Sequence, residues 1–226
     1  MMLILVISWI SLALLFGNIR HLSRGNKVSY TIRMTLYFLP YSVPAILFLS
    51  LSVDINLLDL IGCVVALLVY MIWLCLNYKS IKTSLTKEII ARSPKIPKYT
   101  IFFRIFNSLG AAICEELFFR AFILSIAAPI VVLIILSTVL FTLSHYLLPW
   151  SSGFIKEDYI NQTVIGFVCA VMFVVTGSII SCILLHLLMN TPTIIKELRC
   201  FDRHYIRKNK YDEITNRQVS MDELAI

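Results

Sequence analysis

The segment Cys114-Glu115-Glu116-Leu117-Phe118-Phe119-Arg120 places three charged side chains within six positions. The residues around them, 105–134, are otherwise almost wholly apolar. A charged side chain at the centre of a membrane helix costs about 3 kcal/mol on insertion scales, and such residues usually pair with each other or serve function. The segment therefore predicts a membrane helix whose charges have partners, a function, or both.

The rest of the chain is apolar as well. Hydrophobic residues make up 59% and charged residues 15% of the 226 positions, and the mean hydropathy is +0.86. This composition is typical of a polytopic membrane protein. The formal net charge of +7 comes from basic residues in short segments between apolar runs and in the C-terminal tail, so we expect no nucleic-acid partner.

Seven apolar runs are long enough to span a bilayer, at about 20 residues each. We therefore expect an all-α, polytopic transmembrane helical bundle, in which any active site would lie inside the bundle. The first run lacks the features of a cleaved signal and is interpreted as a retained helix. The runs are residues 1–19, 32–53, 57–78, 105–126, 129–148, 160–176 and 178–195.

Loop charges predict the orientation. The segments after the first and third helices and the tail are basic, which places the N-terminus outside and the C-terminus in the cytoplasm. We divide the chain into N-terminal helices with a basic loop (1–99), a core of four helices that carries the charged segment (100–196) and a charged, flexible tail (197–226). Within the first part, residues 79–99 suit either an interfacial amphipathic helix on anionic lipid or an ordinary basic loop.

The two glutamates of the opening segment have different expected roles. Glu116 and Arg120 are four residues apart, so they share one helix face and can form an ion pair. Glu115 projects about 100° away around the helix. A glutamate in an apolar bundle can take a proton from water near neutral pH. The alternative is a buried ion pair that only fixes the helix register.

Two later helices carry further pairs of residues at four-residue spacing. Phe141 precedes the polar His145 on one helix, and the polar residues His186 and Asn190 form the pair on the other. Each alone could be an interfacial residue or a contact between helices. Together with Glu115 they supply a carboxylate, two imidazoles and an amide, which can activate water and stabilise an oxyanion. A zinc-type metal held by Glu115, His145 and His186 is the alternative. A nucleophilic Cys114 or Ser144 is disfavoured because neighbours on a helix point apart.

These residues resemble the motifs of the CPBP intramembrane proteases, also called the Abi or CAAX-protease family. The resemblance covers about residues 105–192 and includes the turn Thr176-Gly177-Ser178. One departure is Ala170, where the family usually has a second glycine four residues after Gly166. The first three helices carry no motif of this family.

The resemblance implies that Glu115 activates water with help from His145, and that His186 and Asn190 stabilise the oxyanion. Glu116, Arg120 and Phe141 are then supporting residues, although the choice between the two glutamates stays open. No cofactor is favoured, and a divalent metal such as zinc is the alternative.

The function expected from this resemblance is endopeptidase cleavage of a membrane-associated protein or peptide, in bacteriocin or pheromone processing or in self-immunity. The expected partners are that substrate and the lipid bilayer, with no expectation for the oligomeric state. Two alternatives remain. One is a non-proteolytic scaffold, immunity or lipid-modification partner, and the other is a proton-coupled transporter.

Overall fold

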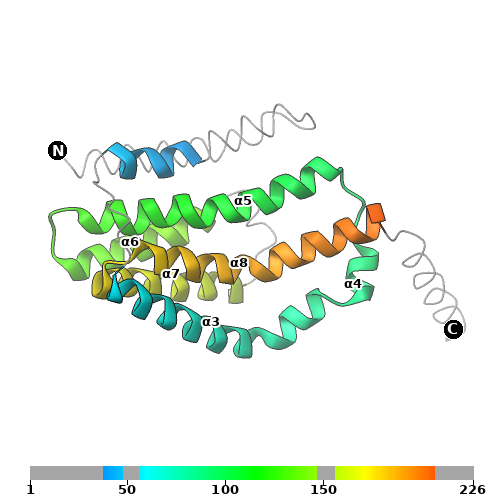
Figure 1. Ribbon diagram of the computed structural model, residues 1–226, viewed down its shortest axis with the longest axis horizontal. Helices are drawn as coiled ribbons and strands as arrows, with labels where there is room; N and C mark the ends of the chain where they lie inside the picture. Colours follow the sequence, from blue (N-terminus) through cyan, green and yellow to red (C-terminus); the bar gives the residue numbers. More distant parts are fainter. Residues whose placement is uncertain (1–37, 48–55, 147–155, 207–226) are drawn as a thin grey trace, which may run out of the picture. The chain divides into compact units, whose positions relative to one another are not determined.

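The computed structural model describes residues 38–47, 56–146 and 156–206, which form helices joined by turns (Figure 1). No β-strand occurs in these three ranges, so the predicted all-α architecture is confirmed for them. The expected helix at 1–19 lies outside the described residues. The elements are helix Phe38–Leu47, α3 (Leu57–Ser84), α4 (Lys87–Arg92), α5 (Lys98–Glu116), the π-helical η1 (Leu117–Phe122), the 3-10 turn η2 (Ile123–Ser125), α6 (Ile130–Tyr146), α7 (Lys156–Thr176), α8 (Ile179–Phe201) and the π-helical η4 (Asp202–Ile206).

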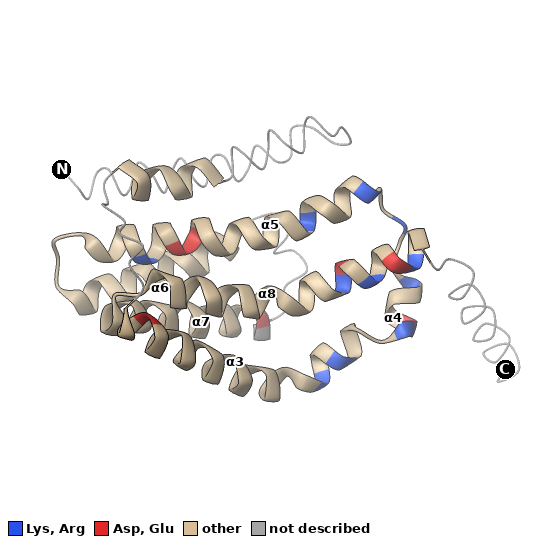
Figure 2. Ribbon diagram, in the orientation of Figure 1, with Lys and Arg blue, Asp and Glu red and all other residues tan. Residues whose placement is uncertain are grey.

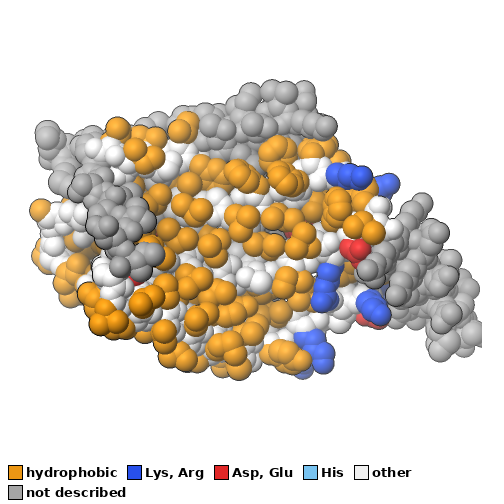
Figure 3. Space-filling model, in the orientation of Figure 1, with side chains coloured by type: hydrophobic (Ala, Val, Ile, Leu, Met, Phe, Trp, Pro, Cys, Tyr) orange, Lys and Arg blue, Asp and Glu red, His pale blue; other side chains and the backbone are white. Residues whose placement is uncertain are grey.

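Three of the described helical segments are long and apolar enough to cross a membrane, Leu57–Ser84, Asp158–Thr176 and Ile179–Ile206. Shorter apolar helices occupy Phe38–Leu47 and Ile130–His145. Large hydrophobic side chains are exposed along these elements, and orange side chains dominate the surface seen in Figure 3. An apolar surface of this extent is unusual for a soluble monomer and suits contact with lipid.

The chain divides into two compact units, each built from separate stretches of sequence. The first contains the residues up to Leu68 together with Gly110–His186. The second contains Val69–Leu109 and the residues from Leu187 onward. Helices α3, α5 and α8 each contribute one part to each unit. The charged segment from Cys114 to Arg120 lies in the first unit.

Local hydrogen bonds set the helix ends of the first unit. Asn56 accepts from the backbone N–H groups of Leu58 and Asp59, and the Asp59 carboxylate accepts from the N–H of Asn56. This reciprocal pairing satisfies donors that a helix start leaves open. Between α7 and α8, Gly177 adopts a φ of 68°, a left-handed conformation that favours glycine, and donates to the carbonyl of Phe173.

The basic residues of the second unit gather around α4 and the ends of α5 and α8 that belong to this unit (Figure 2). Residues 79–99 do not form one amphipathic helix. The first part of this segment extends α3 to Ser84, and Thr86 caps the short helix α4. The residues from Ser93 to Pro97 are not helical, because a residue that precedes a proline disfavours the helical conformation.

Arginines of the last helix bind the carbonyls of this segment. Arg199 donates to Leu85, and Arg203 donates to the carbonyls of Ile90 and Ser93 at 2.6 and 2.8 Å. In the first part of the expected tail, from residue 197, helix continues to Ile206. The remainder of the tail lies outside the described residues.

The fourth expected helix, 105–126, differs in two respects. Helix α5 begins earlier, at Lys98, since a charged residue ends an apolar run without ending a helix. The α-helical hydrogen bonding ends at Glu116, and a π-helical turn, η1, follows directly. The seven consecutive residues from Phe118 to Leu124 are all buried. This segment is covered on every side, unlike a helix with a lipid-facing side.

Candidate active site

Glu116, at the last position of α5, is the centre of a buried polar cluster. The carboxylate and the Arg120 guanidinium are both fully buried. The Nε atom of Arg120 lies 3.0 Å from Oε2 of Glu116, and its Nη2 atom lies 3.5 Å from Oε1. The structure therefore contains the ion pair that the four-residue spacing predicts. The shorter contact lacks the direction of a hydrogen bond, so the attraction there is mainly electrostatic.

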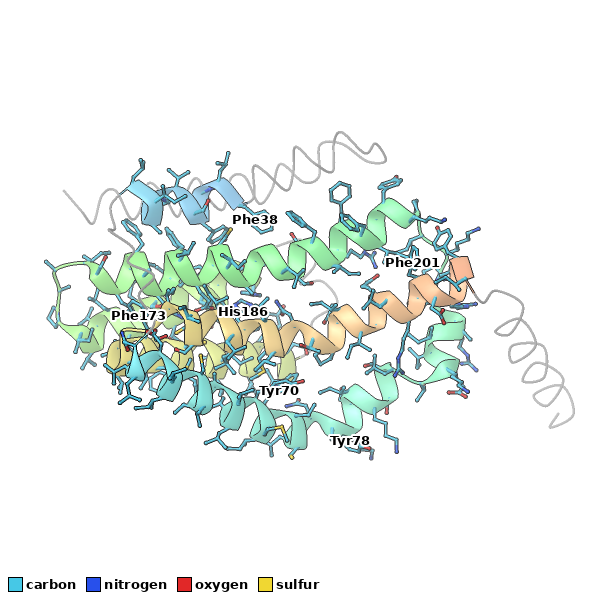
Figure 4. All side chains as sticks on the ribbon, in the orientation of Figure 1. Phe38, Tyr70, Tyr78, Phe173, His186 and Phe201 are labelled. Atoms are coloured by element: carbon cyan, nitrogen blue, oxygen red, sulfur yellow. The ribbon has the colours of Figure 1, made fainter. Side chains whose placement is uncertain are left out.

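His186, on α8, contacts the same Glu116 carboxylate (Figure 4). Its Nδ1 atom lies 2.8 Å from Oε1 of Glu116. An ionised carboxylate only accepts hydrogen bonds, so Nδ1 must carry the proton. This contact differs from the expected grouping, in which His186 served the oxyanion and Glu116 paired only with Arg120.

Ser137 on α6 is a member of the cluster that the sequence analysis missed. Its hydroxyl donates to the Phe119 carbonyl at 2.7 Å and accepts from Nη1 of Arg120 at 3.2 Å. The side chain is fully buried. A signal was present in the sequence, because Ser137 precedes Phe141 and His145 at successive four-residue steps and hence lies on the same helix face.

Glu115 faces the other histidine. Its Oε2 atom lies 3.6 Å from Nε2 of His145, and both side chains are almost fully buried. The Nδ1 atom of His145 lies 2.9 Å from the Phe141 carbonyl. A carbonyl only accepts, so Nδ1 is the protonated nitrogen and Nε2 is the one presented to Glu115. The two glutamates thus contact different histidines, from α6 and α8.

Phe141 packs between these groups. Its ring centroid lies 4.6 Å from that of His145 and 5.7 Å from that of His186. The guanidinium carbon of Arg120 lies 4.7 Å from the Phe141 ring centroid, which is within the range of a cation–π interaction. One aromatic ring therefore positions both histidines and covers the arginine.

Asn190 belongs to the second unit, where its side-chain amide donates to the carbonyl of Ser108 at 2.8 Å. The cluster around Glu116 and His186 belongs to the first unit. Ser144 donates to the Phe141 carbonyl at 2.7 Å, so its hydroxyl hydrogen is directed at backbone. This geometry does not favour Ser144 as a nucleophile.

The side chains expected to bind a metal, Glu115, His145 and His186, are not arranged around one point. Among the described residues, no three His, Cys, Asp or Glu side chains are placed to bind one ion. The two histidines contact different carboxylates: His186 contacts Glu116, and His145 faces Glu115. Glu115, His145 and His186 do not fit a shared metal ion in this structure.

Comparison with protein families gives a match over residues 97–192 to the model described as type II CAAX prenyl endopeptidase Rce1-like. Residues 97–192 are therefore similar to this family of proteases. The match confirms the resemblance to the CPBP proteases, and it begins just before α5 and ends within α8. No curated protein and no solved structure gives a significant match.

The matched residues 97–192 contain every member of the two carboxylate–histidine contacts and Asn190. Helix α3 lies outside the matched residues, as expected from its lack of a family motif. The family assignment and the long apolar helices together identify an integral membrane protein. The family is one of proteases, which agrees with the hydrolytic chemistry expected for the cluster.

Proposed function

We propose that the chain is an intramembrane endopeptidase in which Glu115 and His145 activate water. The observation that carries this proposal is the approach of His145 Nε2 to Glu115 Oε2 at 3.6 Å. His145 Nδ1 is fixed by the Phe141 carbonyl, so Nε2 is directed at the carboxylate. Two acceptor atoms at this separation can each take a hydrogen from one bridging water.

The proposed reaction transfers one proton from water to the Glu115 carboxylate as the water oxygen bonds to the scissile carbonyl carbon. The carbonyl oxygen becomes an oxyanion, which the resemblance assigns to His186 and Asn190. Collapse of the tetrahedral intermediate breaks the C–N bond, and protonated Glu115 returns the proton to the leaving amine. The products are a carboxylic acid and an amine, and Glu115 regains its starting state.

The family description supports a prenylated peptide as the first substrate class to test. A CAAX prenyl endopeptidase acts on a chain whose Cys carries a prenyl group near the C-terminus. The first substrate to test is therefore a short peptide with a farnesylated Cys in a C-a-a-X ending, beside the same peptide without the lipid. A peptide pheromone or bacteriocin precursor, or a role in self-immunity, is the second substrate class.

The experiment compares the purified wild type with Glu115→Gln and His145→Ala in lipid nanodiscs, using fluorogenic versions of both peptides. Glu88→Gln, an exposed glutamate on α4, is the matched control. General base catalysis contributes about 10²- to 10⁴-fold. We expect kcat to fall by that amount in both site variants and to stay within about twofold in the control.

Equal cleavage by the wild type and Glu115→Gln would contradict the proposed role of Glu115. A wild type that cleaves neither peptide nor the precursor class would favour the non-proteolytic alternative. A proton-dependent flux across sealed vesicles that Glu115→Gln abolishes would favour the transporter.

A further inference from the structure

We propose that Glu116 is a positioning residue for His186: it holds the imidazole with Nδ1 protonated and stabilises the doubly protonated ring that can donate from Nε2. This inference rests on the proposed protease function for its catalytic consequence. It goes beyond the expectation that Glu116 and Arg120 only fix a helix.

The distances distinguish the two roles. An ion pair that only fixed the helix would be complete with Arg120, four residues along the same chain segment. The shortest polar contact of Glu116 is instead with His186, 70 residues away on α8. His186 is also almost completely buried. A buried histidine with one nitrogen on a carboxylate has its tautomer set by that contact.

The tautomer has a consequence for the oxyanion. When Nδ1 carries the only ring proton, Nε2 is an acceptor and cannot donate to a negatively charged oxygen. A second proton on Nε2 turns the ring into an imidazolium, which donates from both nitrogens. The Glu116 carboxylate, at 2.8 Å, is the group that stabilises this cation. The donation requires no proton transfer, so His186 is unchanged after the reaction.

Arg120 and Ser137 fix the carboxylate in turn. Arg120 contacts both oxygens of Glu116, and its Nη1 atom donates to Ser137, whose own hydrogen is directed at the Phe119 carbonyl. The polar chain therefore runs from backbone through Ser137, Arg120 and Glu116 to His186. Every side chain in it is buried, so water does not compete for these contacts.

The test measures the protonation of His186 directly. Protein labelled with ¹⁵N-histidine is studied in nanodiscs by NMR, and the His186 signals are assigned by their loss in His186→Gln. We expect both ring nitrogens of wild-type His186 to show the shifts of protonated nitrogens. A wild-type His186 with a bare Nδ1 or a bare Nε2 would overturn the proposal without any variant.

Glu116→Gln then removes the negative charge with little change in shape. We expect the imidazolium signal to disappear and kcat for the cleaved peptide to fall about 100-fold or more, as for a histidine that loses its carboxylate, with KM within about twofold. Glu116→Asp keeps the charge and should restore part of both readouts. Unchanged His186 signals together with kcat within about twofold in Glu116→Gln would overturn the proposal.

If Glu116→Gln fails to assemble, Ser137→Ala tests the same chain with a smaller change. The expected result is a fall in kcat of several-fold at constant KM with an altered His186 shift, and unchanged values for both would count against the proposal. The NMR measurement needs no substrate. A protein that cleaves nothing but shows the expected His186 signals would therefore reject the protease function and retain the positioning role.

Discussion

Gly166 on α7 lies against Phe141 on α6 so closely that an added Cβ atom would stand 2.9 Å from Cδ1 of the ring. Phe141 cannot easily retreat, because it is fully buried between the two histidines and Arg120. The spacing of α6 and α7 at this point depends on the missing side chain. The small residue at 166 is thus part of the site's geometry.

Gly166→Ala should therefore be harmful although alanine normally favours a helix. The propensity gain is about 1 kcal/mol, whereas overpacking a rigid core costs about 1–3 kcal/mol and displaces the ring. We expect lower thermal stability in nanodiscs and weaker activity. Phe141→Leu in the same chain should relieve part of the stability loss, and simple additivity of the two stability changes would contradict the contact.

Arg120→Met should destabilise the protein strongly. Removing one partner of a buried ion pair costs about 3–5 kcal/mol, and here it leaves the Glu116 carboxylate with His186 as a remaining partner. Thermal unfolding and membrane abundance measure the loss. Adding Glu116→Leu removes the stranded carboxylate as well, so the double variant should be more stable than Arg120→Met. A double variant that is less stable would show that losing the Glu116–His186 contact costs more than leaving the carboxylate without Arg120.

Gly177 provides a backbone test free of packing effects. Its φ of 68° is left-handed, and nothing lies within 4 Å of an added Cβ atom. Gly177→Ala should cost about 1–2 kcal/mol through backbone strain alone. Gly177→Asn should cost less, because asparagine tolerates this conformation. Equal melting temperatures for the wild type and Gly177→Ala would contradict the left-handed turn.

Arg203→Ala should loosen the segment after α4 in the second unit. The arginine donates to two carbonyls at that helix end, and hydrogen bonds from charged groups contribute about 1.5–3 kcal/mol each when buried, less at this partly exposed site. Limited trypsin digestion should cut at Arg92 or Lys95 several-fold faster. The reference is Lys196→Ala, which removes a positive charge from the same helix. Equal acceleration in both variants would indicate a general charge effect.

A chelator should leave peptide cleavage unchanged. Glu115, His145 and His186 divide between two carboxylate–histidine contacts and do not converge on one ion. We expect phenanthroline to alter the initial rate by less than about twofold, with a zinc protease inhibited in parallel. Loss of activity that added zinc restores would support the metal alternative instead.

The sequence predicted the elements of the site better than their connections. Four-residue spacing is a local property of a helix, so the Glu116–Arg120 pair followed from the sequence alone. The contact of His186 with Glu116 joins residues 70 positions apart and depends on how α8 packs. Ser137 escaped notice because a single serine in an apolar helix is common, and only its neighbours give it a role.

Helix boundaries also show which features are local in the sequence and which depend on packing. Apolar length predicted the three long membrane-spanning helices among the described residues. Helices α3 and α8 extend well past their apolar runs, because charged residues are good helix formers. The π-helical turn after Glu116 has no local signature. Such turns arise from packing around the helix, and they often occur at functional sites.

The buried run from Phe118 to Leu124 also affects how the protein is made. A segment with an arginine and no lipid-facing side gains little from the bilayer before its neighbours arrive, since Tyr41 and Phe141 supply its contacts. Its insertion by the translocon should therefore depend on helices that flank it in the chain. Damage to the helix at Phe38–Leu47, remote from any reacting group, would then appear first as failed biogenesis and degradation in the cell.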